Sequence, residues 1–268
     1  MTSVRVRAAM LALWLGGSLA GCAAAPDAHI PTFAKAPYEP FSRQAVVSIA
    51  IREWRLFGEP IFANNDGAEA RADEGYHPEQ VSSLWQRIGE YWWLALPGDQ
   101  RARSRTGKHD ERGVPFKPGD DAPYAWSAVF VSYVMRIAGA GAGFPYAPAH
   151  ADYINEAWRA SVGQAPPRRV WAERIETYAP QLGDLICFGR AGNFGLRFES
   201  LPIRRFASHC DIVVDVAPRR LSVIGGNVGD AVTLKQVPVT EEGRLAGLDG
   251  PIDRRFPWFV VIRVLYDR

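Results

Sequence analysis

The chain has 268 residues, of which 47% are hydrophobic and 22% charged, and its formal net charge is +2. A nucleic-acid-binding protein would show a concentrated basic face, whereas the Arg residues here are scattered along the sequence, so the composition argues against that class. The hydrophobic content is ordinary for a globular protein, and residues 41–268 are enough for one domain with a sizeable core.

The N-terminus carries a targeting signal. Arg5 and Arg7 precede a short apolar stretch that is too short to span a bilayer and is typical of a secretory signal peptide. The stretch ends in Leu19-Ala20-Gly21-Cys22, which resembles the lipobox of bacterial lipoproteins. The resemblance implies lipid attachment at Cys22 and, because no Asp follows, an outer-membrane lipoprotein that faces the periplasm. An ordinary signal peptide with an incidental Cys is the alternative.

Changes in composition along the sequence divide the chain into regions. After a signal peptide over 1–21, an Ala- and Pro-rich stretch over 22–40 predicts a flexible tether. One domain is expected over 41–268, with a helical annex at 41–97 and a core at 121–268.

Apolar spacing predicts helices in the first part of this domain. The pattern fits helices over 42–57, 78–96, 126–138 and 150–160, most of them bounded by Pro or Gly. Residues 98–123 are charged and rich in Gly and Pro, which predicts a long loop that forms either a wall of a site or a solvated connector.

The sequence pattern in the second part of the domain differs from that in the first part. Short β-branched runs are separated by Pro, Gly and Arg-Arg turns, and they predict an antiparallel sheet of about five strands, over 184–188, 211–216, 221–224, 232–237 and 258–266. Helices followed by strands indicate an α+β fold.

Three polar residues stand at the ends of these elements and suggest acyl-transfer chemistry. Ser127 opens an apolar helix, His209 opens a strand, and Asn227 ends the next strand. Such a site needs a nucleophile, a base and a group that orients the base. A helix N-terminus contributes roughly 0.3–1 kcal/mol, which cannot ionise a hydroxyl, so Ser127 would need His209 as a general base. An N-cap is the ordinary role of Ser at a helix start.

Four motifs carry a resemblance to a known superfamily. The run Ala125-Trp126-Ser127-Ala128-Val129-Phe130-Val131-Ser132-Tyr133-Val134 resembles the Trp-Cys-Ala-Ala-Phe-Val-Ser-Trp-Val pattern of CHAP- and NlpC-type peptidases and amidases. Their Pro-x-x-Gly-Asp strand, Gly-His strand and third polar residue are similar to Pro180-Gln181-Leu182-Gly183-Asp184, Ser208-His209 with Ile212-Val213-Val214, and Ile224-Gly225-Gly226-Asn227. The resemblance covers about 121–237 and implies a papain-like fold.

The resemblance also implies a function. It predicts a peptidase or amidase that acts on peptidoglycan stem peptides, in which Ser127 attacks, His209 moves the proton and Asn227 orients His209. The family nucleophile is Cys, and the whole chain most resembles an uncharacterised bacterial lipoprotein family related to these enzymes that has Ser in its place. A catalytically inactive binding or scaffold module, or acyl transfer to lipid or sugar by the same Ser, are the alternatives.

Four further residues are candidates for substrate binding or for holding the oxyanion. Related enzymes often have a Tyr at the position of Tyr124, and Trp126 lies between it and Ser127; core packing is the alternative for Tyr124. His150 begins a helix and could line the cleft or cap that helix. Asp211 faces the same side of its strand as His209 and could replace Asn227 as the partner or anchor the substrate.

Two cysteines, Cys187 and Cys210, follow Cys22 in the sequence. Cys187 and Cys210 lie on predicted strands; a disulfide is conceivable in the periplasm, but two buried free thiols are favoured. Two Cys without a spaced His pair do not form a zinc site, and no metal or cofactor is expected.

The expected partners are the membrane, through a lipid on Cys22, and a cell-wall peptide or envelope protein, with no nucleic acid. The chain itself is expected to be a monomer.

Overall fold

The computed structural model describes residues 40–62, 77–99, 104–107, 109–110, 112–116, 124–247 and 249–266. The predicted signal peptide, Cys22 and all of the predicted tether except Pro40 lie outside these residues. None of the described helices is long and apolar enough to cross a membrane.

Four α-helices are described, and each matches a prediction. They are α2 (Arg43–Leu56), α3 (Leu84–Ala95), α4 (Ser127–Ile137) and α5 (His150–Ser161). The helix expected from residue 78 differs at its start, where a 3-10 turn, η1 (Pro78–Gln80), comes first. Ser83 has a φ of 76°, and its backbone N–H donates to the side chain of Gln86, so α3 begins only at Leu84. A residue with a positive φ cannot continue a right-handed helix, so Ser83 separates the 3-10 turn from α3.

The strands form one antiparallel sheet of six, in the order β1-β8-β2-β3-β4-β5. Their bounds are β1 (Val170–Glu173), β2 (Leu185–Gly189), β3 (Ser208–Ala217), β4 (Arg220–Val228), β5 (Ala231–Pro238) and β8 (Trp258–Val264). Strand β1 was not predicted. Two short strands, β6 (Ala246–Gly247) and β7 (Gly250–Pro251), pair separately. Two further 3-10 turns are η4 (Gly141–Gly143) and η5 (Phe198–Ser200). The α+β prediction is confirmed.

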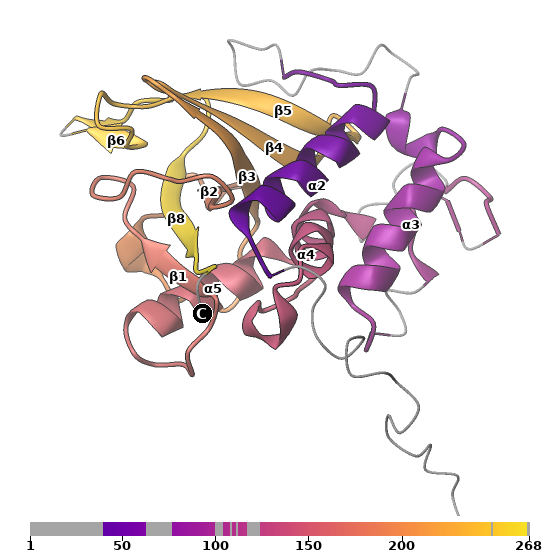
Figure 1. Cartoon of the computed structure of the whole chain (residues 1–268), viewed down its shortest axis with the longest axis horizontal. Helices are drawn as coiled ribbons and strands as arrows, with labels where there is room; N and C mark the ends of the chain where they lie inside the picture. Colours follow the sequence, from indigo (N-terminus) through magenta and orange to yellow (C-terminus); the bar gives the residue numbers. More distant parts are fainter. Residues whose placement is uncertain are drawn as a thin grey trace, which may run out of the picture. The chain divides into compact units, whose positions relative to one another are not determined.

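Helix α4 is the buried centre of the helical layer. Every residue from Ser127 to Met135 is buried, and the helix packs against β3 and β4 as well as against α2 and α3 (Figure 1). Gly226 on β4 permits this packing, because a Cβ there would lie 2.5 Å from the Cβ of Phe130. A glycine in a strand thus lets the first turns of α4, and Ser127 with them, approach the sheet closely.

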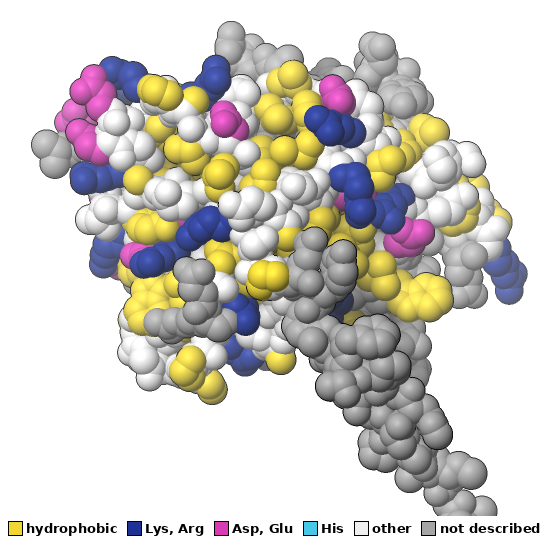
Figure 2. Space-filling view, in the orientation of Figure 1, with side chains coloured by type: hydrophobic (Ala, Val, Ile, Leu, Met, Phe, Trp, Pro, Cys, Tyr) yellow, Lys and Arg dark blue, Asp and Glu magenta, His cyan; other side chains and the backbone are white. Residues whose placement is uncertain are grey.

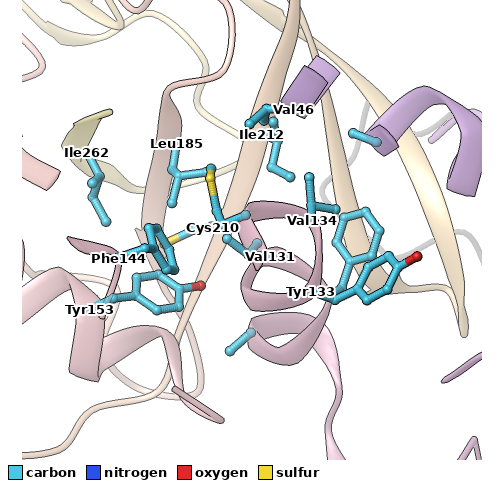
Figure 3. Close-up of a cluster of buried hydrophobic side chains, with 14 of the residues drawn as sticks. Val46, Val131, Tyr133, Val134, Phe144, Tyr153, Leu185, Cys210, Ile212 and Ile262 are labelled. Carbon is cyan, nitrogen blue, oxygen red and sulfur yellow. The ribbon is translucent and has the colours of Figure 1, made fainter. Parts of the chain in front are cut away.

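A disulfide joins Cys187 to Cys210. The two residues are direct partners in the antiparallel pairing of β2 with β3, which brings their side chains to the same face. The prediction of two free thiols is therefore wrong. Figure 3 shows Cys210 between the sheet residues Leu185 and Ile212 and the helical residue Val131, inside the buried core. The bond fixes β3 at the residue next to His209.

The surface visible in Figure 2 is mixed in character. Lys and Arg side chains are spread among acidic and hydrophobic ones, and no broad region of that face carries a single sign of charge. The near-neutral net charge of +2 is consistent with this distribution.

Candidate active site

Ser127 is the first residue of α4 and is 6% exposed. The N-cap position is held by Trp126, so the alternative of Ser127 as the helix cap is wrong. Its Oγ lies 2.8 Å from Nε2 of His150, the residue that begins α5. A hydroxyl at this distance from an imidazole nitrogen is within hydrogen-bond reach, which is the relation between a nucleophile and a histidine in acyl-transfer sites.

The other ring nitrogen of His150 also has a hydrogen-bond partner. Its Nδ1 contacts the hydroxyl of Tyr153, one turn further along α5, where side chains three residues apart meet. Both rings are buried. Burial lowers the pKa of His150 well below its ordinary value, and the neighbouring His209 lowers it further. Burial, reinforced by the charge of Asp211, raises the pKa of Tyr153 well above its ordinary value. At neutral pH the imidazole is therefore uncharged and the phenol keeps its proton.

A second buried cluster crosses the sheet from β3 to β5. His209 Nε2 lies 2.9 Å from Oδ1 of Asp211, and Nζ of Lys235 donates to both oxygens of Asp211 at 2.9 and 2.8 Å. All three side chains are at most 2% exposed. Burial alone would raise the pKa of Asp211, but the charge of Lys235 and the hydrogen bond from His209 hold it well below its usual range. Asp211 is thus an anion, and His209 Nε2–H donates to it.

The strand pattern explains this arrangement. Residues two apart on a strand share a face, so His209 and Asp211 point to the same side of β3. On β4, Gly225 lies beside them, and a Cβ there would come within 2.0 Å of Asp211 Oδ1 and 2.8 Å of His209 Nε2. Only glycine leaves room for the carboxylate at this position, because any side chain would displace either Asp211 or the strand.

The two clusters meet at their histidines. The ring centroids of His150 and His209 lie 5.1 Å apart. The Nδ1 atom of His209 is buried and has no hydrogen-bond partner within the described residues. Of the four ring nitrogens of the two histidines, it is the one without a partner. Buried polar atoms are normally paired, so an unpaired imidazole nitrogen in this buried cluster calls for an explanation.

The site gives a defined pH dependence of stability. Burial lowers the pKa of His209 to about 4, with Asp211 opposing and Lys235 reinforcing the shift. Because the folded-state pKa lies below the ordinary 6.5, this contribution to stability is complete above pH 6.5 and is lost as the pH falls toward 4. The shift corresponds to about 3 kcal/mol.

Guanidinium unfolding at pH 7.5 and pH 4.5 measures this loss. We expect His209→Gln to show a smaller fall in unfolding free energy between the two pH values than the unsubstituted chain, because the variant lacks this titrating ring. His150, whose pKa is also lowered by burial, keeps its own contribution in both proteins. Equal falls in the two proteins would contradict the assignment.

The remaining sequence candidates lie in different places. Asn227 has a φ of 57° and lies within the irregular stretch of the β4–β5 pairing between Gly225 and Val228, and neither ring nitrogen of His209 has it as a hydrogen-bond partner. Asp211, rather than Asn227, is the hydrogen-bond partner of His209. The Trp126 side chain is buried, and its N–H donates to Glu79 at 2.6 Å. Tyr124 is half-buried and packs against Phe116, with the guanidinium of Arg105 over its ring.

A pocket of about 240 Å³ adjoins His209. Asn227 and Lys235 line it, together with residues of the β2–β3 connection and of the segment before β8. Ser127 is not among the lining residues. Within the described ranges no three His, Cys, Asp or Glu side chains are grouped as a metal site would require.

Two residues of the site were not predicted from the sequence. Tyr153 stands three residues after His150 in an expected helix, and this spacing is the signal that could have identified it. Lys235 stands in an expected strand at a position with the same parity as Val237, which is buried. A lysine on the inward face of a strand indicates a buried anionic partner, because an unpaired buried ammonium is very costly.

One family model matches the chain. Residues 79–264 match DUF2272, described as an uncharacterized protein conserved in bacteria. The match covers α3, α4, α5 and the whole six-stranded sheet, and therefore all of the site residues from Tyr124 to Lys235. No curated protein and no solved structure matches the chain.

Proposed function

We propose that this chain, which belongs to the DUF2272 family of bacterial proteins, is a serine-dependent hydrolase of peptide or amide bonds. The observation that carries the proposal is the buried contact of 2.8 Å between Ser127 Oγ and Nε2 of His150, a ring whose centroid lies 5.1 Å from that of His209, where Nδ1 has no partner among the described residues. In this proposal the domain has a papain-like fold, as the order of the helix, the His strand and the glycine-rich strand suggests.

The hydrogen-bond donors and acceptors of these side chains support a specific catalytic role for each of them. The protonated Tyr153 donates its hydroxyl proton to His150 Nδ1, so His150 Nε2–H donates to Ser127 Oγ. The hydroxyl proton of Ser127 then remains free for another acceptor. His209 offers that acceptor, because Asp211 holds the proton of the ring on Nε2 and leaves a lone pair on Nδ1.

The chemical step follows from these roles. As Ser127 Oγ attacks a carbonyl carbon, its proton passes to His209 Nδ1, and the developing imidazolium is stabilised by Asp211. His150 Nε2–H and the free N–H groups at the start of α4 stabilise the oxyanion. His209 then gives the proton to the leaving amine, and water repeats the sequence to release the acyl group. Asp211 replaces Asn227 as the orienting residue in this scheme.

The substrate and location in the proposal come from the sequence. A lipid on Cys22 would hold the domain at the outer membrane, facing the periplasm, where peptidoglycan stem peptides supply peptide and amide bonds. The protein without its signal peptide is expected to cleave muropeptides, with products identified by chromatography and mass spectrometry. No cleavage of muropeptides or of simple peptide amides by folded protein would refute the hydrolase proposal.

A non-catalytic binding module is the second candidate. The near-complete burial of Ser127 and the absence of the usual thiol favour it. Ser127→Cys distinguishes the two functions, because a thiol beside a working His209–Asp211 pair should react with iodoacetamide at near-neutral pH, well below the ordinary thiol pKa of about 8.5. An unreactive thiol in a folded variant would favour the binding module.

A further inference from the structure

The pocket beside His209 has a wall of aromatic rings. Its described lining includes the side chains of Phe62, Phe188, Phe194 and Phe256. Apolar walls with a few placed polar groups are typical of a small-ligand site. The pocket volume is about 240 Å³. An apolar cavity of about 150 Å³ in another protein is large enough to bind benzene, so this pocket has room for a group of the size of a phenyl ring.

The cationic side chains that line the pocket are engaged within the protein. Lys235 pairs with Asp211 and Arg255 pairs with Asp253. Arg190 also interacts with other groups of the chain. The ammonium of Lys235 lies 5.1 Å from the ring centroid of Phe256, where it belongs to the wall itself. A ligand of this pocket is therefore recognised mainly by its contacts with the rings.

Asn227 supplies a polar group to the same pocket. It lines the pocket, and its side-chain amide has no hydrogen-bond partner among the described residues. Its φ of 57° lies in the left-handed region, and residues held there are frequent at ligand sites. A side-chain amide has both donors and an acceptor, so it can pair with the N–H and the C=O of a peptide group.

Phe194 forms the most exposed part of the aromatic wall, since 62% of it is accessible to solvent. A turn holds its backbone, because both the backbone N–H and the side-chain amide of Asn193 donate to the carbonyl of Arg190. Gly189 permits this turn, since a Cβ there would lie 1.9 Å from the carbonyl oxygen of Asn193. The Phe194 ring can therefore be removed without opening the buried core.

We infer that this pocket binds a peptide residue whose apolar side chain is about the size of a phenyl ring, with the amide of Asn227 hydrogen-bonded to the peptide group of that residue. His209 lines the same pocket, so the bound residue lies beside the proposed general base. As a specificity subsite for hydrolysis, the pocket rests on the proposed function. Binding of the peptide residue, however, needs no working nucleophile.

Binding of uncharged probes tests the pocket without hydrolysis. N-acetyl-phenylalanine methylamide and N-acetyl-alanine methylamide have the same peptide groups and differ only in the side chain. NMR titration of the Ser127→Ala protein, which cannot use Ser127 to cleave either probe, is expected to give at least about tenfold tighter binding for the phenylalanine probe, because the ring is buried. Equal binding of the two probes would overturn the inference and would leave the hydrolase proposal to its own test.

A substitution at Phe194 locates the side-chain preference. In the same background, Phe194→Ala is expected to reduce the preference for the phenylalanine probe by about threefold or more, because one ring of the wall is lost. The control Trp93→Ala removes an aromatic side chain that is 59% exposed, lies on α3 and does not line the pocket, and it should keep the full preference. The same preference in both variants would contradict the location of the site.

A substitution at Asn227 tests the hydrogen bond to the peptide group. Glycine adopts a positive φ readily, so Asn227→Gly removes the amide and keeps the backbone. We expect this variant to bind the phenylalanine probe about fivefold more weakly, the effect of one hydrogen bond. Its affinity for toluene, which has the ring and no peptide group, should not change. Equal losses for the two ligands, or no loss for either, would contradict the role of Asn227. If a variant does not fold, the comparison of the phenylalanine and alanine probes decides alone.

Discussion

Replacing Ser127 with alanine is expected to lower kcat/KM for muropeptide hydrolysis by at least about 10³-fold. The substitution removes the nucleophile, and loss of a catalytic serine in other acyl-transfer enzymes has effects of this size or larger. Stability should change little, because one hydrogen bond to His150 contributes about 1 kcal/mol. Initial rates of product formation, followed by chromatography, measure the change.

Ser132 provides the matched control. It lies on the same helix, is fully buried, and donates to the carbonyl of Ala147 rather than to either histidine. Ser132→Ala makes the same chemical change and should leave kcat close to that of the unsubstituted protein. Activity that survives in Ser127→Ala would show that another group is the nucleophile.

Asp211 should be essential to both stability and activity. Asp211→Ala leaves the ammonium of Lys235 buried and without its carboxylate, and removing one partner of a buried ion pair typically costs about 3–5 kcal/mol. The free energy of unfolding in guanidinium, measured at pH 7.5, should fall by that amount. A single variant as stable as the unsubstituted protein would contradict the role of this pair.

A double variant separates the two roles. Asp211→Leu with Lys235→Met removes both charges and fills similar volume, so most of the lost stability should return. Hydrolysis should not return, because His209 still lacks the carboxylate that holds its proton on Nε2, and a misoriented base costs roughly 10⁴-fold in kcat in a related arrangement. Recovered activity in the double variant would show that Asp211 acts only through stability.

Much of the fold could be predicted from local sequence patterns. All four described α-helices and five of the six main strands follow apolar spacing that local periodicity makes visible. The missing strand, β1, has only four residues, with alternating buried and half-buried positions, and follows a Pro-Pro-Arg-Arg stretch. It is a strand because its partner β8 supplies hydrogen bonds, and that pairing is a long-range property.

The site was harder to predict, because its contacts join distant segments. Ser127 and His150 meet only because α4 and α5 pack on the same sheet, which no spacing rule contains. The sequence favours Asn227 over Asp211 as the partner of His209, because regular neighbouring strands would bring their ends together. The irregular pairing after Gly225 breaks that regularity, whereas the two-residue spacing on β3 keeps Asp211 beside His209.

Covalent labelling shows whether the hydroxyl of Ser127 is a reactive nucleophile. The folded protein is treated with a fluorophosphonate at pH 7.5, digested, and analysed by mass spectrometry. We expect one phosphonylated peptide, the one that contains Ser127, formed far more slowly in His209→Gln, in which the base is absent. Folded protein that remains unlabelled at Ser127, or that is labelled equally fast in His209→Gln, would contradict this expectation.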